Sequence, residues 1–246
     1  MSVFEILLLL GAGTCAGAIN AVAGGGTFFT FAALTALGLT PLIANATSAV
    51  GLALANLASV AGYLPEVRAH YRRYLSLCIL GSTGGAAGAI LLTQTSPDAF
   101  RVLVPYFLAV ATLLFAVSPY IRKFTNHAKP GPAVQRVMET FVSIYGGYFG
   151  AGMGVMMLAS LSLSEQDDFH FINAAKNVWA FFIQTFSVVL FIIWGLAAWK
   201  PALLIMVSST LSGYFGVSLA RRIPQNWIRA LVIVAGLALT VRFFLA

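Results

Sequence analysis

Ten apolar segments follow one another along the chain, separated by short stretches that are rich in polar residues, proline or glycine. The apolar segments cover residues 3–23, 26–38, 43–64, 74–93, 100–121, 133–150, 153–164, 172–197, 201–220 and 227–245. Most have the roughly 20 residues that an α-helix needs to cross a hydrocarbon core of about 30 Å. The pattern predicts an all-α polytopic membrane protein.

The polar connection 122–132 divides these segments into two sets of five. Sliding the chain against itself by 128 residues, without a gap, places polar and glycine positions of the two sets on one another. The pairs include Gly24 with Gly152, Gly26 with Gly154, Asn45 with Asn173, Asn56 with Gln184 and Ser59 with Ser187. We therefore interpret residues 1–121 and 133–246 as two transmembrane repeats joined by a cytoplasmic linker, 122–132.

The positive charges predict opposite orientations for the two repeats. Three connections, "PEVRAHYRR", "RKFTNHAKPGPAVQR" and "RRIPQNWIR", carry most of the lysines and arginines, so the positive-inside rule places them in the cytoplasm. Connection 38–44 then lies outside, whereas its counterpart, 165–172, lies inside. An odd number of segments in each repeat allows this inversion. We expect two five-segment inverted-topology repeats.

The second segment of each repeat is too short to cross a membrane by itself. A dozen residues make a helix of roughly 18 Å at 1.5 Å per residue, against a core of about 30 Å. We expect each short helix to form a hairpin with the preceding segment, either re-entrant or a full span followed by a short one. At the hairpin tips, free N–H groups at the positive end of a helix dipole would bind an anion. The tip glycines are Gly24, Gly25, Gly26, Gly150, Gly152 and Gly154.

Polar side chains recur on one face of the third segment of each repeat. They are Asn45, Ser48, Asn56 and Ser59 in the first repeat and Asn173, Lys176, Gln184 and Ser187 in the second. Because lipid would leave them without hydrogen bonds, these side chains face protein or water. They either bond helices to one another or line a substrate path. Thr27, Thr47 and Asn177 are weaker candidates nearby.

Lys176 is the one ionisable residue on either polar face, and its counterpart in the first repeat is Ser48. It lies near a helix start, so one interpretation is that its side chain reaches the membrane surface. Otherwise it is the counter-charge for an anionic substrate, or a group whose protonation couples transport to a proton gradient. The acidic run 164–170 is interpreted as a solvated loop, and a proton relay there is disfavoured.

Composition excludes several other classes of function. Hydrophobic residues make up 60% of the 246 residues and charged residues 9%, with a mean hydropathy of +0.92, whereas soluble domains carry about 25% charged residues. The net charge is +7, but the lysines and arginines that produce it are grouped in a few short loops, so we expect no nucleic-acid partner. Cys15 and Cys78 lie in apolar segments, so we expect no disulfide, metal or other cofactor. The three histidines lie in loops and no apolar segment carries two carboxylates, so an enzyme is disfavoured.

Two stretches of the sequence resemble a known family. They are "AGAINAVAGGGTFFTFAALTALGLTPLIANATSAVGLALANLASVAGYL" and "YGGYFGAGMGVMMLASL", and they are similar to the TauE/SafE-type sulfite exporters, also called the toluene sulfonate uptake permease family. The resemblance implies a multi-pass carrier of a prokaryotic cytoplasmic (inner) membrane, with two inverted halves, that moves sulfite or organosulfonate anions coupled to the proton gradient. The family's binding residues fall on Gly24, Gly25, Gly26, Asn45, Thr47, Ser48, Gly152, Gly154, Asn173 and Lys176.

The second half departs from the family's usual pattern in two places. Met153 interrupts its glycines, and Lys176-Asn177 stand where many members have Thr-Ser. We expect the choice of anion to depend on these mismatches.

The sequence thus predicts a secondary transporter, with export as the expected direction, that carries sulfite or a small organosulfonate by alternating access together with protons. The alternative is a passive anion channel or uniporter lined by the same residues, and a biogenesis factor is disfavoured. The candidate substrate-binding residues are Gly24, Gly25, Gly26, Asn45, Thr47, Ser48, Asn56, Gly152, Gly154, Asn173, Lys176, Asn177 and Gln184.

Overall fold

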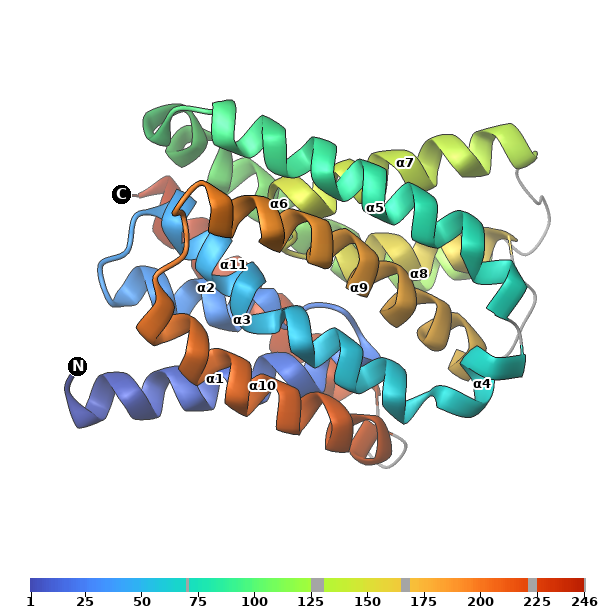
Figure 1. Ribbon diagram of the computed structural model, residues 1–246, viewed down its shortest axis with the longest axis horizontal. Helices are drawn as coiled ribbons and strands as arrows, with labels where there is room; N and C mark the ends of the chain where they lie inside the picture. Colours follow the sequence, from blue (N-terminus) through green and yellow to red (C-terminus); the bar gives the residue numbers. More distant parts are fainter. Residues whose placement is uncertain (70, 125–130, 165–168, 221–224, 246) are drawn as a thin grey trace.

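The computed structural model consists of helices that lie roughly along one long axis (Figure 1). It describes residues 1–69, 71–124, 131–164, 169–220 and 225–245. The helices of these residues are α1 (Val3–Val22), α2 (Thr27–Ala36), α3 (Pro41–Gly62), α4 (Leu64–Ala69), α5 (Tyr71–Gln94), α6 (Pro97–Phe124), α7 (Pro132–Tyr148), α8 (Met153–Ser164), α9 (Phe169–Ile193), α10 (Trp199–Ala220) and α11 (Gln225–Phe244).

The helices confirm the predicted all-α architecture. Each of the ten apolar segments is a helix whose ends lie within four residues of the predicted ones, and only the short α4 was not predicted. α6 continues to Phe124 and α7 begins at Pro132, so their connection is shorter than the predicted linker. Within the loops that carry the charge-based predictions, residues 70, 125–130, 165–168 and 221–224 lie outside the described part.

Five helices in the described part are long and apolar enough to cross a membrane. They comprise Val3–Val22, Pro41–Gly62, Tyr74–Gln94, Pro97–Val117 and Phe171–Ile193. By contrast, α2 has 10 residues and α8 has 12, which gives them lengths of roughly 15 and 18 Å. These two helices are indeed too short to span a core of about 30 Å alone.

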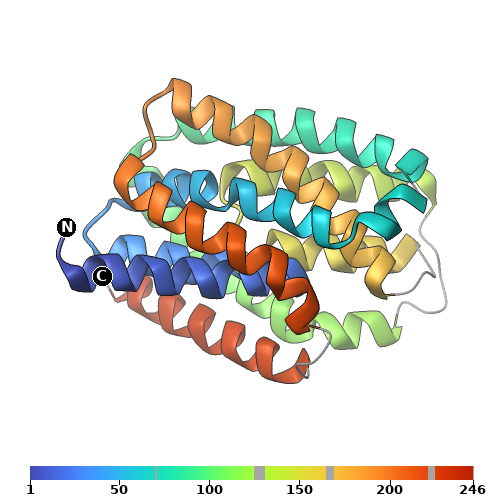
Figure 2. The same cartoon turned by 60° about the horizontal axis from the view of Figure 1, so that its bottom comes forward.

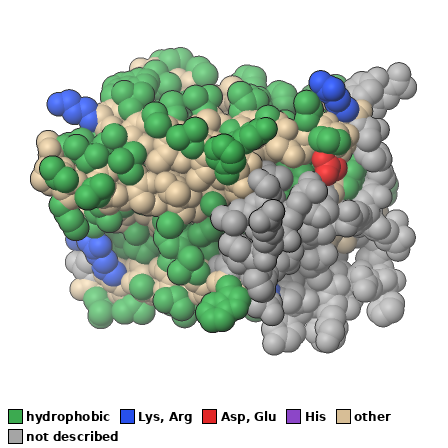
Figure 3. Space-filling model, turned by 90° about the horizontal axis from the view of Figure 1, so that it is seen from below, with side chains coloured by type: hydrophobic (Ala, Val, Ile, Leu, Met, Phe, Trp, Pro, Cys, Tyr) green, Lys and Arg blue, Asp and Glu red, His purple; other side chains and the backbone are tan. Residues whose placement is uncertain are grey.

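The outer surface of the bundle is largely apolar. On α6, Val102, Tyr106, Val110 and Leu113 recur at helical spacing with 50–64% of their surface exposed, while the opposite face of the helix is buried. Figure 3 shows lysine and arginine side chains mainly toward the two ends of the molecule's long axis, with hydrophobic side chains over much of the surface between them. An apolar band of this kind is typical of a surface in contact with hydrocarbon.

Helix packing is reciprocal between the two sets of five segments. α1 packs along α10, which packs along α3; correspondingly, α7 packs along α5, which packs along α9. The 128-residue offset relates α1 to α7, α3 to α9 and α5 to α10, so each contact in the first group has its counterpart in the second. All of these contacts join a helix before residue 122 to one after it, and the two sets are interleaved (Figures 1 and 2).

Two hydrogen bonds between helices repeat this reciprocity. The Ser59 hydroxyl lies 3.4 Å from the Gly213 carbonyl and the Ser187 hydroxyl 2.9 Å from the Gly85 carbonyl, and each shares its one proton with a carbonyl of its own helix at 2.8 Å. Adding 128 to Ser59 and to Gly85 gives Ser187 and Gly213, so the second bond is the first with the two sets exchanged. The serine stripe therefore bonds helices from different sets to each other.

α1 and α7 begin at opposite ends of the molecule. Figure 1 shows α1 starting at the left, where both termini lie, and α7 starting at the right. Each runs toward the middle, and the short helix that follows it, α2 or α8, turns back toward the end from which it came. The two glycine-rich turns consequently face each other near the centre of the bundle.

Candidate functional site

The first glycine-rich turn, which we call the first tip, comprises residues 23–26. α1 ends at Val22, and Gly24 takes a positive φ of +80° that only glycine adopts without strain. The Gly24 N–H donates to the Ile19 carbonyl at 3.1 Å, and the Gly26 N–H donates to the Asn20 side-chain oxygen at 2.7 Å. Two N–H groups expected to bind an anion therefore already have partners within the protein.

The second tip comprises residues 149–152. α7 ends at Tyr148, Gly150 has a φ of +72°, and the Gly150 N–H donates to the Tyr145 carbonyl at 3.2 Å. The Tyr145 hydroxyl donates a hydrogen bond across this turn to the Ala151 carbonyl at 2.7 Å. The second tip thus begins with the same turn as the first, but ends differently, because Gly152 has a φ of +75° where Gly26 has −65°.

The ungapped alignment of the two tips is wrong by two residues. It pairs Gly24 with Gly152, whereas the first positive-φ glycine after each helix is Gly24 in one tip and Gly150 in the other. α7 ends 126 residues after α1 ends, and α8 begins 126 residues after α2 begins. The offset is 128 again at the start of α9, which corresponds to the start of α3. α8 has two residues more than α2 and thereby restores the offset.

The first tip touches the start of α8, directly after the second tip, through glycine. A Cβ atom added to Gly24 would overlap the backbone of Gly154, and one added to Gly154 would overlap the backbone of Gly24. Their closeness therefore needs the absence of side chains at both positions. Gly25 and Gly152 instead face apolar side chains, because added Cβ atoms there would meet Val232 and Ala111.

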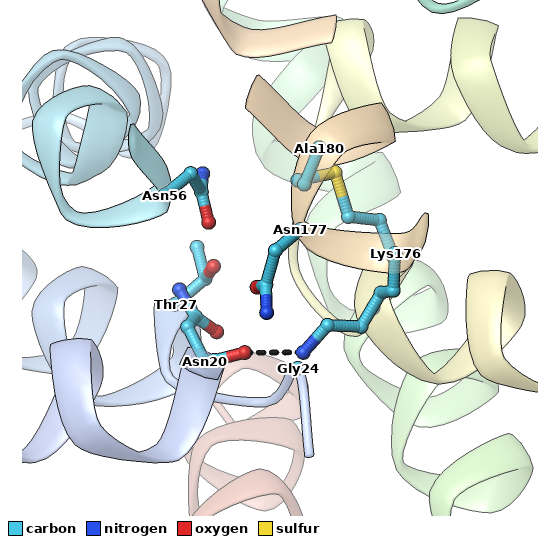
Figure 4. Close-up of a pocket in the computed structure, with 9 residues that line it drawn as sticks. Asn20, Gly24, Thr27, Asn56, Lys176, Asn177 and Ala180 are labelled. Carbon is cyan, nitrogen blue, oxygen red and sulfur yellow. Dashed lines mark hydrogen bonds between the residues drawn. The ribbon is translucent and has the colours of Figure 1, made fainter. Parts of the chain in front are cut away.

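A small polar pocket lies beside this contact. Figure 4 shows its side chains converging from both sets of helices, and the lining residues are Asn20, Gly24, Thr27, Asn56, Met153, Gly154, Lys176, Asn177 and Ala180. The cavity volume is about 10 Å³, which is the space of roughly one water molecule. A larger anion requires the walls to move apart.

Lys176 is the charged group of this pocket. It comes from α9, is 1% exposed, and donates from Nζ to the Asn20 carbonyl at 2.5 Å, as Figure 4 shows. The side chain points toward the first tip, which excludes the interpretation that it reaches the membrane surface. An ammonium group donates three hydrogen bonds, and the Asn20 carbonyl accepts one of them.

Asn177, the next residue on α9, contributes an acceptor without a partner. Its Nδ2 donates to the Ala21 carbonyl at 3.2 Å, while its Oδ1 is buried and has no hydrogen-bond partner. The side chain is 0% exposed. Because the nitrogen must face the Ala21 carbonyl, the amide cannot turn over to pair the oxygen there.

Asn56 and Gln184 join the two polar stripes. The Asn56 Nδ2 donates to the Gln184 Oε1 at 2.6 Å, and the two residues are 128 positions apart. Asn56 lines the pocket, whereas Gln184 does not. At this point the stripe has both of the roles considered from the sequence, as a bond between helices and as a wall of the cavity.

Several candidate residues hold the tips and helix ends and do not line the pocket. The Asn45 Nδ2 donates to the Tyr148 carbonyl at 2.9 Å, the Thr47 hydroxyl accepts from the Ala198 N–H at 3.0 Å, and the Ser48 hydroxyl bonds the Thr30 hydroxyl at 2.5 Å. The others outside the pocket are Gly25, Gly26, Gly152, Asn173 and Gln184. Of the predicted set, the structure brings together Gly24, Asn56, Gly154, Lys176 and Asn177.

Sequence reasoning missed Asn20, which supplies both an accepting carbonyl to Lys176 and a side-chain oxygen to Gly26. It is an amide on an otherwise apolar helix and directly precedes the glycines, which was the available signal. Met153, which the sequence predicts to influence the choice of anion, also lines the pocket, and so does Ala180, whose apolar side chain gave no signal of a site. Met153 is the residue that interrupts the glycines of the second half.

The pocket carries one formal charge and no acid. None of its lining residues is an aspartate or a glutamate, and among the described residues no three His, Cys, Asp or Glu side chains come together as metal ligands. The site therefore offers one lysine amine and neutral hydrogen-bonding groups.

A polytopic helical bundle with broken helices meeting at a buried cationic pocket has the architecture of a membrane transporter. The comparison with known proteins agrees, because the family model "Sulfite exporter TauE/SafE" matches residues 9–243. The chain belongs to the TauE/SafE sulfite exporter family. It is a membrane transporter and not an enzyme.

Three relatives carry transporter names and are similar over nearly their whole length. A probable membrane transporter protein, ORF9, from Sinorhizobium sp. is 25% identical over 92% of this chain and 87% of its own. A probable membrane transporter protein of Haemophilus influenzae is 24% identical over 96% and 93%. The probable membrane transporter protein YfcA of Escherichia coli K12 is 22% identical over 92% and 85%.

Proposed function

We propose that this transporter exports sulfite or a small organosulfonate anion across the prokaryotic cytoplasmic membrane by alternating access, coupled to protons. The observation that carries the proposal is Lys176, a buried cation in a pocket without any acid. A charge in a low-dielectric site is costly unless a counter-charge accompanies it. A small anion between the two tips supplies that counter-charge.

The family supports the sulfur oxyanion as the substrate class. The matching family model is described as a sulfite exporter, and it covers residues 9–243. Sulfite and sulfonates are compact oxyanions whose oxygens accept hydrogen bonds from an ammonium, an amide or a hydroxyl. Lys176, Asn20 and Thr27 bring these three kinds of donor to the pocket.

The reciprocal packing supports an inverted repeat and alternating access. α1 and α7 start at opposite ends of the molecule, and the contacts of each set recur in the other at the 128-residue offset. Two similar units that meet around one site can rock between arrangements that open the site to either side. With the site at the contact of Gly24 and Gly154, motion of one tip opens it to one side.

A flux assay in proteoliposomes tests the function. The purified protein is reconstituted, and movement of sulfite, sulfoacetate, taurine and sulfate is measured with and without an imposed pH gradient. We expect sulfite or a sulfonate to move, to depend on the pH gradient, and to show accelerated exchange when the same anion is present on both sides. No flux of any of these anions would refute the proposed substrate class.

The same assay separates a transporter from a channel. Flux that ignores the pH gradient and shows no exchange acceleration would support the passive anion channel or uniporter. Lys176→Met liposomes serve as the control for leakage, because that variant lacks the proposed counter-charge. Flux equal to the wild type in this variant would contradict the assignment of the site.

A further inference from the structure

The pocket offers acceptors as well as donors to its ligand. On the acceptor side, Asn177 Oδ1 is buried without a partner, and Asn56 presents a second amide oxygen because its nitrogen is committed to Gln184. On the donor side stand Lys176 and the amide nitrogen of Asn20, whose oxygen accepts from Gly26. The mixture differs from a simple anion site, in which every group would donate.

The balance of charge in the pocket favours a singly charged anion. Lys176 is the one charged residue among those that line it, and the walls are buried among helices. A monoanion neutralises this charge, whereas a dianion leaves one uncompensated negative charge in a low-dielectric site. This cost separates hydrogensulfite and sulfonates from sulfite dianion and sulfate.

The unpaired oxygen of Asn177 adds a second requirement. A buried acceptor without a donor loses its hydration and gains nothing in return. A fully deprotonated oxyanion raises this free-energy cost further, because its oxygens are also acceptors and repel the amide oxygen of Asn177. A ligand with an O–H or N–H group beside its anionic group satisfies both Lys176 and Asn177.

We propose that the transported species is a monoanionic sulfur oxyanion that carries its own hydrogen-bond donor, with Lys176 binding the anionic oxygens and Asn177 Oδ1 accepting the donor. Hydrogensulfite and hydroxysulfonates have this chemistry; sulfite dianion, sulfate, plain alkanesulfonates and the zwitterionic aminosulfonates do not. The inference rests on the proposed function and narrows its substrate class.

The proposal gives a route for the proton that needs no carboxylate. Hydrogensulfite released into water dissociates to a sulfite dianion and a proton, so one proton crosses with each sulfite, bound to the substrate. The pocket contains no acid that could carry it instead. Lys176 is its one titratable group, and the residues that face it from α1, α2, α3 and α8 are neutral.

Two sulfonates of equal charge and nearly equal size test the donor requirement. Competition against radiolabelled sulfite in nanodiscs is measured with 2-hydroxyethanesulfonate and with ethanesulfonate, which differ only by the O–H group. We expect the hydroxylated anion to compete at least about tenfold more strongly, because ethanesulfonate has no hydroxyl group and leaves a buried acceptor unpaired. Neither anion titrates near neutral pH, so both keep the same charge and the ratio reports the effect of the O–H group.

Asn177→Leu and Asn45→Leu form a matched pair of variants. Each removes one amide that donates to a backbone carbonyl in the last turn of a helix before a tip, Ala21 for Asn177 and Tyr148 for Asn45, but only Asn177 lines the pocket. We expect Asn177→Leu to reduce the preference for the hydroxylated anion to about twofold or less, and Asn45→Leu to keep it. Because the measurement is a ratio within one variant, a general loss of stability cancels.

The outcomes distinguish this inference from the function on which it rests. If sulfite binds but both sulfonates compete equally in the wild type, the donor requirement is wrong and the transporter assignment stands. If neither sulfonate competes, the pH dependence of sulfite binding decides. We then expect binding to depend on the concentration of hydrogensulfite at each pH. Binding that depends only on the total concentration of sulfite overturns the inference. Absence of binding by sulfite and by both sulfonates refutes the proposed function itself.

Discussion

At the scale of single residues, Lys176 decides what the pocket can hold. Its position near the start of a predicted helix left two interpretations open, because a lysine there reaches the surface as easily as the interior. The tertiary structure directs it to the carbonyl of Asn20, 156 residues away in the sequence. No local pattern encodes that contact, since it depends on how α9 packs beside α1.

Replacing this lysine should weaken anion binding without unfolding the protein. In Lys176→Met we expect sulfite affinity to fall roughly ten- to hundredfold, since a hydrogen bond to a charged group is worth about 1.5–3 kcal/mol. The unfolding midpoint should change little, because loss of one bond is offset by removal of a buried charge. Equilibrium binding in nanodiscs and thermal unfolding measure the two effects.

Lys200→Met is the matched control, because Lys200 is an exposed lysine on α10. It removes the same charge from the chain and should leave affinity unchanged. Equal losses in both variants would mean that Lys176 acts only through the overall charge of the protein.

At the scale of elements, the tips depend on glycine for different reasons. Gly24 needs its positive φ and its contact with Gly154, whereas Gly25 is required by packing against Val232. The sequence located both tips correctly, since glycine clusters interrupt apolar runs there. It misjudged the N–H groups of Gly24 and Gly26, because the carbonyl of Ile19 and the side chain of Asn20 accept from them.

Comparing Gly154→Ala with Gly24→Ala should separate the effect of packing from the effect of backbone strain. Its Cβ would overlap the Gly24 backbone, so we expect Gly154→Ala to lower the free energy of unfolding by about 1–3 kcal/mol and to reduce transport. Gly24→Ala should cost more, because strain at a φ of +80° adds to the same overlap. Thermal unfolding in detergent measures both.

Gly11→Ala on α1 is the control, since nothing lies within 4 Å of an added Cβ there. Alanine is the better helix former by about 1 kcal/mol, so this variant should be at least as stable as the wild type. A Gly154→Ala protein as stable as Gly11→Ala would show that the tips are not in tight contact.

At the scale of the whole molecule, the inverted repeat has a direct test. In a background of Cys15→Ala and Cys78→Ala, single cysteines are introduced by Thr40→Cys, in the turn after α2, and by Asp167→Cys, which lies outside the described residues. We expect an impermeant thiol reagent to label Thr40→Cys from outside the cell and Asp167→Cys only after the membrane is opened. Labelling of both from one side would refute the inverted orientation.

The sequence by itself determined the membrane environment, the number and ends of the apolar helices, and the places where two of them break. These features follow from local properties, namely hydropathy, segment length and the conformational freedom of glycine. It also indicated the 128-residue pairing, through polar residues at a constant spacing. The sequence did not predict the two-residue shift at the second tip. An ungapped alignment cannot detect that this turn begins two residues sooner and that α8 is two residues longer than α2.

Only the tertiary structure decided which polar residues form the pocket. Asn45, Asn56 and Lys176 lie on similar faces of two related helices. Asn45 nevertheless donates to the last residue of α7, Asn56 to the side chain of its own counterpart, and Lys176 to the end of α1. The difference depends on which helix end or glycine lies opposite each side chain after the two sets interleave. That is a property of packing between distant segments, and the periodicity of a single helix contains no information about its neighbour.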